Sequence, residues 1–202
     1  MYSFIVNPNS RSGEGRNVWN RLRSIMESQG ISYQYFLTEY VGHATVLAEK
    51  ISADIGDETI TLICILKGSV FFSCELAKHL KMPVTLDFMS VSSYGNSTSS
   101  SGKLTIKKDL EQSIQGVDCL LIEDIIDTGY TLSMLKPMLL ERKPKSFKIC
   151  TLLNKPDRRE VEMEADYTGF AIPDEFVVGY GLDYAQKYRN LPYVGTLEFV
   201  EE

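Results

Sequence analysis

Residues 120–131 read LLIEDIIDTGYT, and this stretch decides the fold. Its apolar start predicts a buried β-strand that carries two adjacent carboxylates, Glu123 and Asp124, at its carboxyl end. A third carboxylate, Asp127, precedes a glycine-containing turn that opens a helix. In an open parallel sheet, ligands bind beyond the carboxyl ends of the strands. The stretch therefore predicts an α/β protein with a ligand site at this strand end.

The turn after this strand has the features of a phosphate-binding loop. A glycine turn at a helix start presents backbone N–H groups and the positive end of the helix dipole. Thr128 and Thr131 can add hydroxyl donors, and the acceptor-only carboxylates of Glu123 and Asp124 suit the two hydroxyls of a ribose. The stretch therefore predicts a sugar-phosphate site. The alternative is an acidic first turn that only complements the helix dipole.

Outside this stretch, short apolar runs alternate with longer amphipathic runs, which is typical of βαβ units and a parallel sheet. No linker rich in proline, glycine or serine divides the chain, which favours one compact unit. We expect strands at 3–6, 32–37, 59–66, 84–92, 118–123, 145–153, 166–172 and 176–180, an alternating segment at 103–107, and helices at 16–28, 43–51, 70–79 and 131–142.

The composition is that of a globular protein with a core, because 44% of the 202 residues are hydrophobic and 24% are charged. The formal net charge is −6 and no lysine or arginine block occurs, which argues against a nucleic-acid or anionic-membrane surface. We find no signal-peptide pattern, no membrane-spanning apolar run and no paired cysteine spacing. These features predict a cytoplasmic protein with reduced cysteines.

From about Cys64 to Glu198, the chain resembles the bacterial hypoxanthine-guanine members of the type I phosphoribosyltransferases. The resembling stretches, besides residues 120–131, are ILKGSVFF (65–72), PVTLDFMSVSSYG (83–95), ICTLLNKPDRR (149–159) and PDEFVVGYGLDYAQKYRNLPYVG (173–195). The resemblance implies a Rossmann-like parallel sheet with flanking helices. It also implies transfer of a phosphoribosyl group from phosphoribosyl pyrophosphate to a 6-oxopurine base, with Mg²⁺ as cofactor.

The resemblance further implies roles for single residues. Asp127 would take the purine N7 proton, Lys155 would donate to the purine 6-oxo group, and Asp183 would bind magnesium, with Glu123 and Asp124 as further metal ligands. The remaining positions would contact pyrophosphate (Lys67, Gly68, Arg189), close over the site (Ser93, Tyr94), bind the ribose hydroxyls (Glu123, Asp124), hold the 5′-phosphate (Thr128, Gly129, Tyr130, Thr131) or bind the base (Phe176, Val177). The family often has a cis peptide bond in the loop that Lys67 and Gly68 match.

Residues 1–60 do not share this resemblance. They resemble the N-terminal segment of diacylglycerol and other lipid kinases, in FIVNPNSRSGEGRNVW (4–19) and YFLTEYVGHATVLAEKI (35–51). In those kinases the NPNS turn and a stretch like the one containing Thr38, Gly42 and His43 help to bind nucleotide. The kinase motif GGDGT is absent, and KGSVFF follows the strand near residue 66 instead. We therefore expect no lipid phosphorylation. We expect a chimera in which a βαβα segment, residues 1–60, packs onto the same sheet as a transferase domain, residues 61–202.

Three functions remain open from the sequence. The first is an active 6-oxopurine phosphoribosyltransferase, and the second is a non-catalytic chimera that keeps a phosphate- or nucleotide-binding loop. The third, a nucleotide-binding lipid-kinase fragment, is disfavoured because GGDGT is absent. The expected partners are a purine base, phosphoribosyl pyrophosphate and a nucleoside monophosphate, together with a second copy of the chain in a dimer or tetramer, without nucleic acid or membrane. The choice among hypoxanthine, guanine and xanthine stays open.

Overall fold

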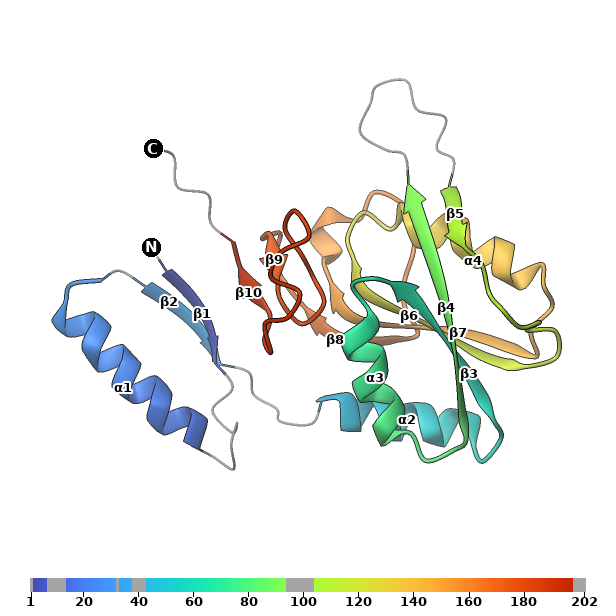
Figure 1. Cartoon of the computed structure of the whole chain (residues 1–202), viewed down its shortest axis with the longest axis horizontal. Coiled ribbons are helices and arrows are strands. Elements are labelled where there is room, and N and C mark those ends of the chain that lie inside the picture. The colour runs from blue at the N-terminus through green and yellow to red at the C-terminus, as the bar shows by residue number, and fades with distance from the viewer. Residues whose placement is uncertain (1, 7–13, 32, 38–42, 94–103, 198–202) are drawn as a thin grey trace, which may run out of the picture. The chain divides into compact units, whose positions relative to one another are not determined.

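The chain is divided into two compact units (Figure 1). The computed structural model describes residues 2–6, 14–31, 33–37, 43–93 and 104–197. The large unit spans Ala44–Asp174, and the small unit combines Met1–His43 with Glu175–Glu202. The expectation that the chain packs as one compact unit stays a prediction. Several positions named from the sequence lie outside the described residues, namely Asn7, Pro8, Ser10, Thr38, Gly42 and Tyr94.

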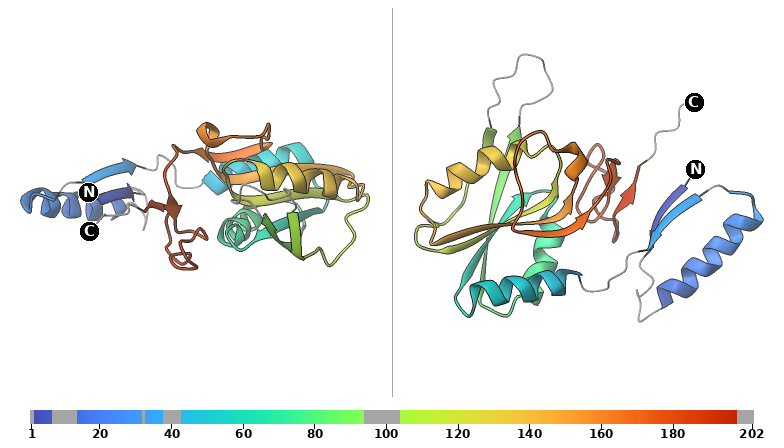
Figure 2. Two further views of the ribbon diagram at one scale, coloured as in Figure 1. Left: turned by 90° about the horizontal axis from the view of Figure 1, so that it is seen from above. Right: turned by 180° about the vertical axis from the view of Figure 1, so that it is seen from behind.

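A six-stranded sheet in the order β5-β4-β3-β6-β7-β8 forms the centre of the large unit, and its strands are twisted relative to one another (Figure 2). All neighbouring strands are parallel except β4 and β5, which are antiparallel. The elements are α2 (His43–Ile55), β3 (Ile60–Leu66), α3 (Val70–His79), β4 (Val84–Ser93), β5 (Leu104–Lys108), β6 (Asp118–Ile126), α4 (Tyr130–Leu140), β7 (Ser146–Asn154), the 3₁₀ turn η2 (Pro156–Arg158) and β8 (Tyr167–Ala171). The predicted α/β class, a mainly parallel sheet with flanking helices, is confirmed.

Helices cover both faces of this sheet, which is why β3 is almost wholly apolar and β6 is apolar from Cys119 to Ile122. On one face, Ile63 of β3 and Leu121 of β6 pack in a core cluster with Leu132, Leu135 and Leu139 of α4. The opposite face carries the alternate strand residues, since side chains point alternately to the two faces. There Cys64 contacts Ser73 of α3, and the hydroxyl of Tyr167 donates to Asp54 of α2 at 2.7 Å. The ligand edge of β6 is thus fixed from both sides.

Three of the four cysteines, Cys64, Cys119 and Cys150, lie in apolar strand-like runs of the sequence, which predicts their burial, and the structure confirms it. Cys64, Cys119 and Cys150 are buried in strands, whereas Cys74 is exposed. Burial raises the pKa of the Cys64 and Cys119 thiols to about 11 and that of Cys150 to about 12. These three thiols are therefore protonated, as expected of cysteines that act as small apolar side chains.

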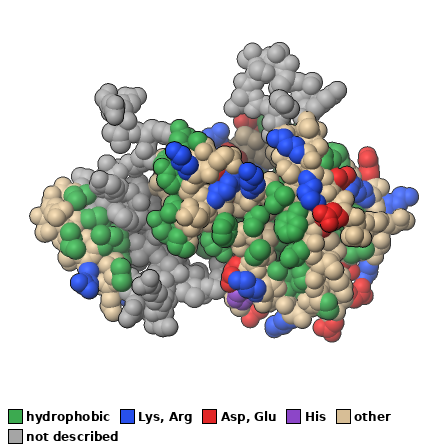
Figure 3. Space-filling view, in the orientation of Figure 1, with side chains coloured by type: hydrophobic (Ala, Val, Ile, Leu, Met, Phe, Trp, Pro, Cys, Tyr) green, Lys and Arg blue, Asp and Glu red, His purple; other side chains and the backbone are tan. Residues whose placement is uncertain are grey.

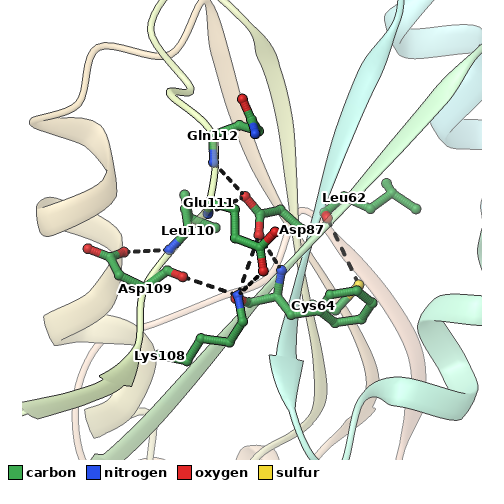
Figure 4. Close-up of polar contacts among 9 residues, drawn as sticks. Leu62, Cys64, Asp87, Lys108, Asp109, Leu110, Glu111 and Gln112 are labelled. Carbon is green, nitrogen blue, oxygen red and sulfur yellow. Dashed lines mark hydrogen bonds and ion pairs between the residues drawn. The ribbon is translucent and has the colours of Figure 1, made fainter.

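A buried carboxylate anchors the segment that follows β5 (Figure 4). Asp87 of β4 is only 5% exposed and accepts hydrogen bonds from the backbone N–H groups of Phe88, Glu111 and Gln112, at 2.7, 2.9 and 3.2 Å. Lys108 lies 4.0 Å from the same carboxylate and donates to the Phe88 carbonyl at 3.1 Å. Asp87 thus ties β4 to the chain that leaves β5.

Replacing Asp87 with alanine should lower the free energy of unfolding by about 2–4 kcal/mol, because three backbone N–H groups would lose their acceptor. Urea denaturation of the two proteins measures this difference. The matched control is Asp109→Ala, since the Asp109 side chain is 50% exposed and pairs with Arg142 on the surface. The control should lose less than about 1 kcal/mol. Equal losses for both variants would show that the buried anchor contributes nothing special.

The small unit contains two short sheets. Strands β1 (Tyr2–Val6) and β2 (Tyr33–Leu37) pair in parallel, and β9 (Val177–Val178) pairs antiparallel with β10 (Gly195–Thr196). Helix α1 (Glu14–Ser28) connects β1 and β2 along the chain. The helical periodicity of the sequence predicts one apolar face made of Val18, Trp19, Leu22, Ile25 and Met26. Of these residues, Trp19 and Met26 are buried. The other members of that face, Val18, Leu22 and Ile25, are exposed within the described part of the chain.

The boundary between the units differs from the expected boundary near residue 60. In the described residues, the hydrogen-bonded ladder of β1 and β2 shares no strand with the six-stranded sheet. Helix α2 also belongs with the large unit, apart from its first residue. The expected packing of residues 1–60 onto the same sheet and a domain division at residue 60 stay predictions.

Two surface properties bear on the expected partners. Within the described residues, no helix has the length and apolar character needed to cross a bilayer. On the face drawn in Figure 3, lysine and arginine side chains are interspersed with acidic and apolar ones. The expected absence of a nucleic-acid partner stays a prediction.

Candidate active site

The turn between β6 and α4 has the geometry of an anion-binding loop. Gly129 precedes α4 with a φ of +89°, a left-handed conformation that favours glycine, and no side chain caps the helix. The N–H groups in the first turn of a helix have no partner within the helix. A Cβ at Gly129 would lie 3.1 Å from Val161 Cγ2 and 3.2 Å from Arg159 Cδ, so the turn is also packed tightly. The predicted phosphate turn is thus a preformed one.

The two adjacent acids at the end of β6 differ in their surroundings. The Oε2 atom of Glu123 is buried and has no hydrogen-bond partner. Burial, together with the negative charge of Asp124, raises the pKa of Glu123 well above its usual range. A buried carboxylate oxygen without a partner costs stability, so this oxygen is poised to bind a hydroxyl or a cation.

The loop after β3 lies directly against the second of these acids. A cis peptide bond joins Leu66 and Lys67, in the loop where the resemblance implies one. A Cβ at Gly68 would lie 1.7 Å from Asp124 Oδ2, which leaves room only for glycine. The loop that we expect to contact pyrophosphate therefore lies beside the acids that we expect to contact ribose.

Asp127 and Lys155 lie close to an additional pair of charges. Lys155, directly after β7, is only 5% exposed, and its Nζ atom is 3.7 Å from Asp174 Oδ1. Arg158 bridges two carboxylates, with its Nε atom 2.9 Å from Asp127 Oδ1 and its Nη1 atom 3.2 Å from Asp174 Oδ1. Arg159 donates to the backbone carbonyl of Asp127. Asp174, and after it Asp127, raise the pKa of Arg158.

The remaining predicted residues belong to the small unit. Asp183 and Arg189 form an ion pair of 2.6 Å, and Arg189 also donates to the Gly181 carbonyl at 2.6 Å. Phe176 is 46% exposed, and its ring meets Tyr184 edge to face, with 5.8 Å between the ring centroids. Val177 of β9, which pairs with Thr196 of β10, is buried. The charges of Asp183, the predicted magnesium ligand, and Arg189, the predicted pyrophosphate contact, thus neutralise each other within the small unit.

The large unit brings together most of the predicted site. The carboxyl ends of β3, β6 and β7, which are neighbours in the sheet, carry Lys67, Gly68, Glu123, Asp124, Asp127, Thr128, Gly129, Tyr130, Thr131 and Lys155. Ser93 is the last residue of β4, and Tyr94 lies outside the described residues. Phe176, Val177, Asp183 and Arg189 are held by the small unit.

Comparison with known proteins shows which family the chain belongs to. The phosphoribosyl transferase domain family matches residues 37–185. A hypoxanthine-guanine phosphoribosyltransferase of Streptococcus pneumoniae is 53% identical over 155 residues, which cover 77% of this chain and 86% of that protein. The chain belongs to the hypoxanthine-guanine phosphoribosyltransferase family.

Solved structures of this family have the same fold. The chain matches a hypoxanthine-guanine phosphoribosyltransferase from Bacillus anthracis with a TM-score of 0.74 and 49% identity, covering 77% of this chain and 92% of that one. A hypoxanthine phosphoribosyltransferase from Trypanosoma cruzi, solved in complex with the product IMP, gives a TM-score of 0.72 and 38% identity, covering 77% of this chain and 88% of that one.

The N-terminal part of the chain also matches a second family. The diacylglycerol kinase catalytic domain family matches residues 1–66, which overlaps with the transferase match from residue 37 onward. Because this second match covers a minor part of the chain, it does not change the family assignment. The origin of the N-terminal part as one half of a chimera stays a prediction.

The sequence missed three charged residues of the site. Arg158, Arg159 and Asp174 were quoted only as parts of resembling stretches, with no role attached to them. The signal was available in part, because two adjacent arginines lie three and four positions after the predicted base-binding Lys155. Their partners could not be read from spacing, since Arg158 contacts an aspartate 31 positions earlier in the chain, Asp127.

In this hypoxanthine-guanine phosphoribosyltransferase-like site, Glu123→Gln should raise the stability of the metal-free protein at pH 8. A carboxyl whose pKa is raised by folding stabilises the fold fully at low pH and loses that contribution as pH rises through its folded pKa. The amide does not ionise, so the variant should gain about 1 kcal/mol or more at pH 8 and almost nothing at pH 4. Urea denaturation with a chelator present at both pH values measures the gain. A gain of equal size at both pH values would contradict the assignment.

Proposed function

We propose that the protein transfers the phosphoribosyl group of phosphoribosyl pyrophosphate to hypoxanthine or guanine, which yields a nucleoside monophosphate and pyrophosphate. The single observation that carries this proposal is the end of β6, where Glu123, Asp124 and Asp127 precede the glycine turn of α4. Three acceptors and a row of backbone donors suit a ribose 5′-phosphate at both of its ends. The names of the relatives support the same reaction.

The proposed step forms one bond and breaks one bond. Purine N9 bonds to C1′ of the ribose as the bond from C1′ to pyrophosphate oxygen breaks, and that bond's electron pair leaves with the pyrophosphate. The proton on N7 goes to the carboxylate of Asp127, while the ring keeps the electrons of the N–H bond. Asp127 is therefore the proposed general base, a role that carboxylates fill when they lie within hydrogen-bond reach of the proton.

Magnesium is the proposed cofactor. The buried, unpartnered Oε2 of Glu123 beside Asp124 offers the oxygen donors that Mg²⁺ prefers. Mg²⁺ usually takes one or two protein carboxylates together with substrate phosphate oxygens, and Asp183 is the further ligand that we propose. When bound, it would stabilise negative charge on the departing pyrophosphate. Lys67 and Arg189 would add positive charge for the same leaving group.

A buried lysine explains the proposed choice of base. Lys155 is 5% exposed and its ammonium can donate to a 6-oxo oxygen. The 6-amino group of adenine would set a donor against this donor, which leaves a buried polar group unpaired. Phe176 would stack on the base, Val177 would read its edge through the backbone, and Ser93 and Tyr94 would close over the site. The dimer or tetramer and the cytoplasmic location stay predictions.

A specificity assay tests the proposal. Full-length protein with phosphoribosyl pyrophosphate and Mg²⁺ should convert hypoxanthine and guanine to nucleotides, and adenine at least about 100-fold less efficiently. A chelator should abolish all conversion. Equal use of adenine, or no nucleotide from folded protein, would contradict the proposal. The second of these results would favour a non-catalytic chimera that retains only the phosphate turn.

We also propose that the N-terminal segment derives from a lipid-kinase domain joined to the transferase. Support comes from the kinase-family match to residues 1–66 and from the separate ladder of β1 and β2. We propose no kinase activity, because KGSVFF follows β3 in place of GGDGT. Nucleotide formation by the full chain would show that such a graft is compatible with the transferase reaction.

A further inference from the structure

The segment after β7 approaches the site from one side. Residues 155–159, KPDRR, contain the 3₁₀ turn η2 and follow directly on the strand that neighbours β6. The backbone N–H groups of Glu160 and Val161 donate to the Thr128 carbonyl at 3.0 and 3.3 Å. This segment is therefore fixed against the turn that carries Asp127, and its arginines are held close to that residue.

Four charges of alternating sign form a continuous chain along this segment. Lys155 Nζ lies 3.7 Å from Asp174 Oδ1, which lies 3.2 Å from Arg158 Nη1, and Arg158 Nε lies 2.9 Å from Asp127 Oδ1. The two ends of the chain are Asp127 and Lys155, the proposed partners of N7 and of the 6-oxo oxygen. These two purine atoms lie on the same edge of the base.

The two oxygens of Asp127 are not equivalent. Oδ1 is buried and faces Arg158, whereas the Asp127 side chain as a whole is 42% exposed. The exposure of this side chain therefore comes from its atoms other than Oδ1. The carbonyl of the same residue accepts from Arg159, so Asp127 is held from both its backbone and its side chain.

We propose that Arg158 and Asp174 are positioning residues that set the spacing between Asp127 and Lys155 for the 6-oxopurine edge. Arg158 holds Oδ1 of Asp127, which leaves Oδ2 for the N7 proton. Asp174 lies between the two cations and prevents their mutual repulsion from driving Lys155 out of its buried place. This inference rests on the proposed function.

The chain of charges acts on the base rather than on the fold. Arg158 and Asp174 have side-chain exposures of 44% and 49%, and exposed ion pairs contribute little to folding stability. A misplaced catalytic group, in contrast, can cost about 100-fold in rate even when the displacement is small. A positioning role therefore predicts a loss of activity with base and no loss of stability.

The test replaces Arg158 with glutamine and follows each substrate separately. With saturating phosphoribosyl pyrophosphate and Mg²⁺, kcat/KM for hypoxanthine should fall about 10- to 100-fold. The KM for phosphoribosyl pyrophosphate and the melting temperature should not change. The inhibition constant of 7-deazahypoxanthine, which has a C–H in place of the N7 group, should also stay the same. The Arg158→Lys protein should retain more of the kcat/KM for hypoxanthine than the Arg158→Gln protein does. Adding Asp174→Asn to the Arg158→Gln protein should lower this kcat/KM little further.

The matched control is Arg142→Gln. Arg142 forms a similar surface ion pair, in which its Nη2 atom lies 2.8 Å from Asp109 Oδ2, and this pair is outside the site. This control should behave as the unchanged protein. The inference fails if kcat/KM for hypoxanthine is the same in Arg158→Gln as in the control. It also fails if Arg158→Gln raises the inhibition constant of 7-deazahypoxanthine by the same factor by which it lowers kcat/KM for hypoxanthine. If the protein without any substitution made no nucleotide, the proposed function would be overturned, and the inference with it.

Discussion

Asp127→Asn should lower kcat for hypoxanthine by about 100- to 10,000-fold, the range that general-base catalysis contributes. Asparagine keeps the size of the side chain, but its amide oxygen cannot take the N7 proton. Arg158 would also lose its carboxylate partner, which now lies at 2.9 Å. Binding of phosphoribosyl pyrophosphate should change little, because the phosphate turn and the two adjacent acids stay intact. Steady-state kinetics with each substrate varied in turn measures both parameters.

The control for this variant is Asp109→Asn. Asp109 also faces an arginine, Arg142, at 2.8 Å, but on the surface beyond the site. Its replacement should leave kcat within about twofold, as is usual for exposed ion pairs. If Asp127→Asn retained more than a tenth of the original kcat, Asp127 would not be the general base.

Gly68→Ala should abolish most activity, because it should impair the use of phosphoribosyl pyrophosphate. The added Cβ would stand 1.7 Å from Asp124 Oδ2 and 2.4 Å from its Cγ, so the carboxylate must leave its place. Displacement of a group that orients substrate costs about 100-fold, and we expect kcat/KM for phosphoribosyl pyrophosphate to fall by that factor or more. Overpacking should also lower the free energy of unfolding by about 1–3 kcal/mol.

The matched glycine control is Gly195→Ala. The nearest atom to a Cβ at this position is Tyr193 Cε2 at 3.7 Å, which is an ordinary contact. Thermal melting of both variants separates the loss of substrate use from the loss of stability. A Gly68→Ala protein with unchanged kinetics would show that Asp124 does not need its observed position.

The strands of the large unit could be predicted because burial on both faces leaves a direct pattern in the sequence. The expected strand at 59–66 is almost wholly apolar, and the expected strand at 118–123 is apolar from Cys119 to Ile122. They correspond to β3 and to the start of β6, the two central strands. The start of α4 was predictable for a similar local reason, since a glycine with positive φ marks the turn before it. Acids at the end of β6 then indicated the ligand edge.

Other features depend on contacts that no local pattern contains. The helical periodicity of residues 16–28 predicted α1 and its apolar stripe, but it could not show that Val18, Leu22 and Ile25 would remain exposed in the described chain. Strand β10 has two residues, which is too short to leave an alternating pattern. The bridge from Arg158 to Asp127 and Asp174 joins parts of the chain that meet only after the sheet has formed.

The most direct test of the central claim is product stoichiometry with the full chain. Purified protein is incubated with guanine, phosphoribosyl pyrophosphate and Mg²⁺, and nucleoside monophosphate and pyrophosphate are quantified together. We predict that both products appear in equal amounts over many turnovers, and that Asp127→Asn protein forms them at least about 100-fold more slowly. A folded protein that releases pyrophosphate without nucleotide, or that forms neither product, would contradict the account.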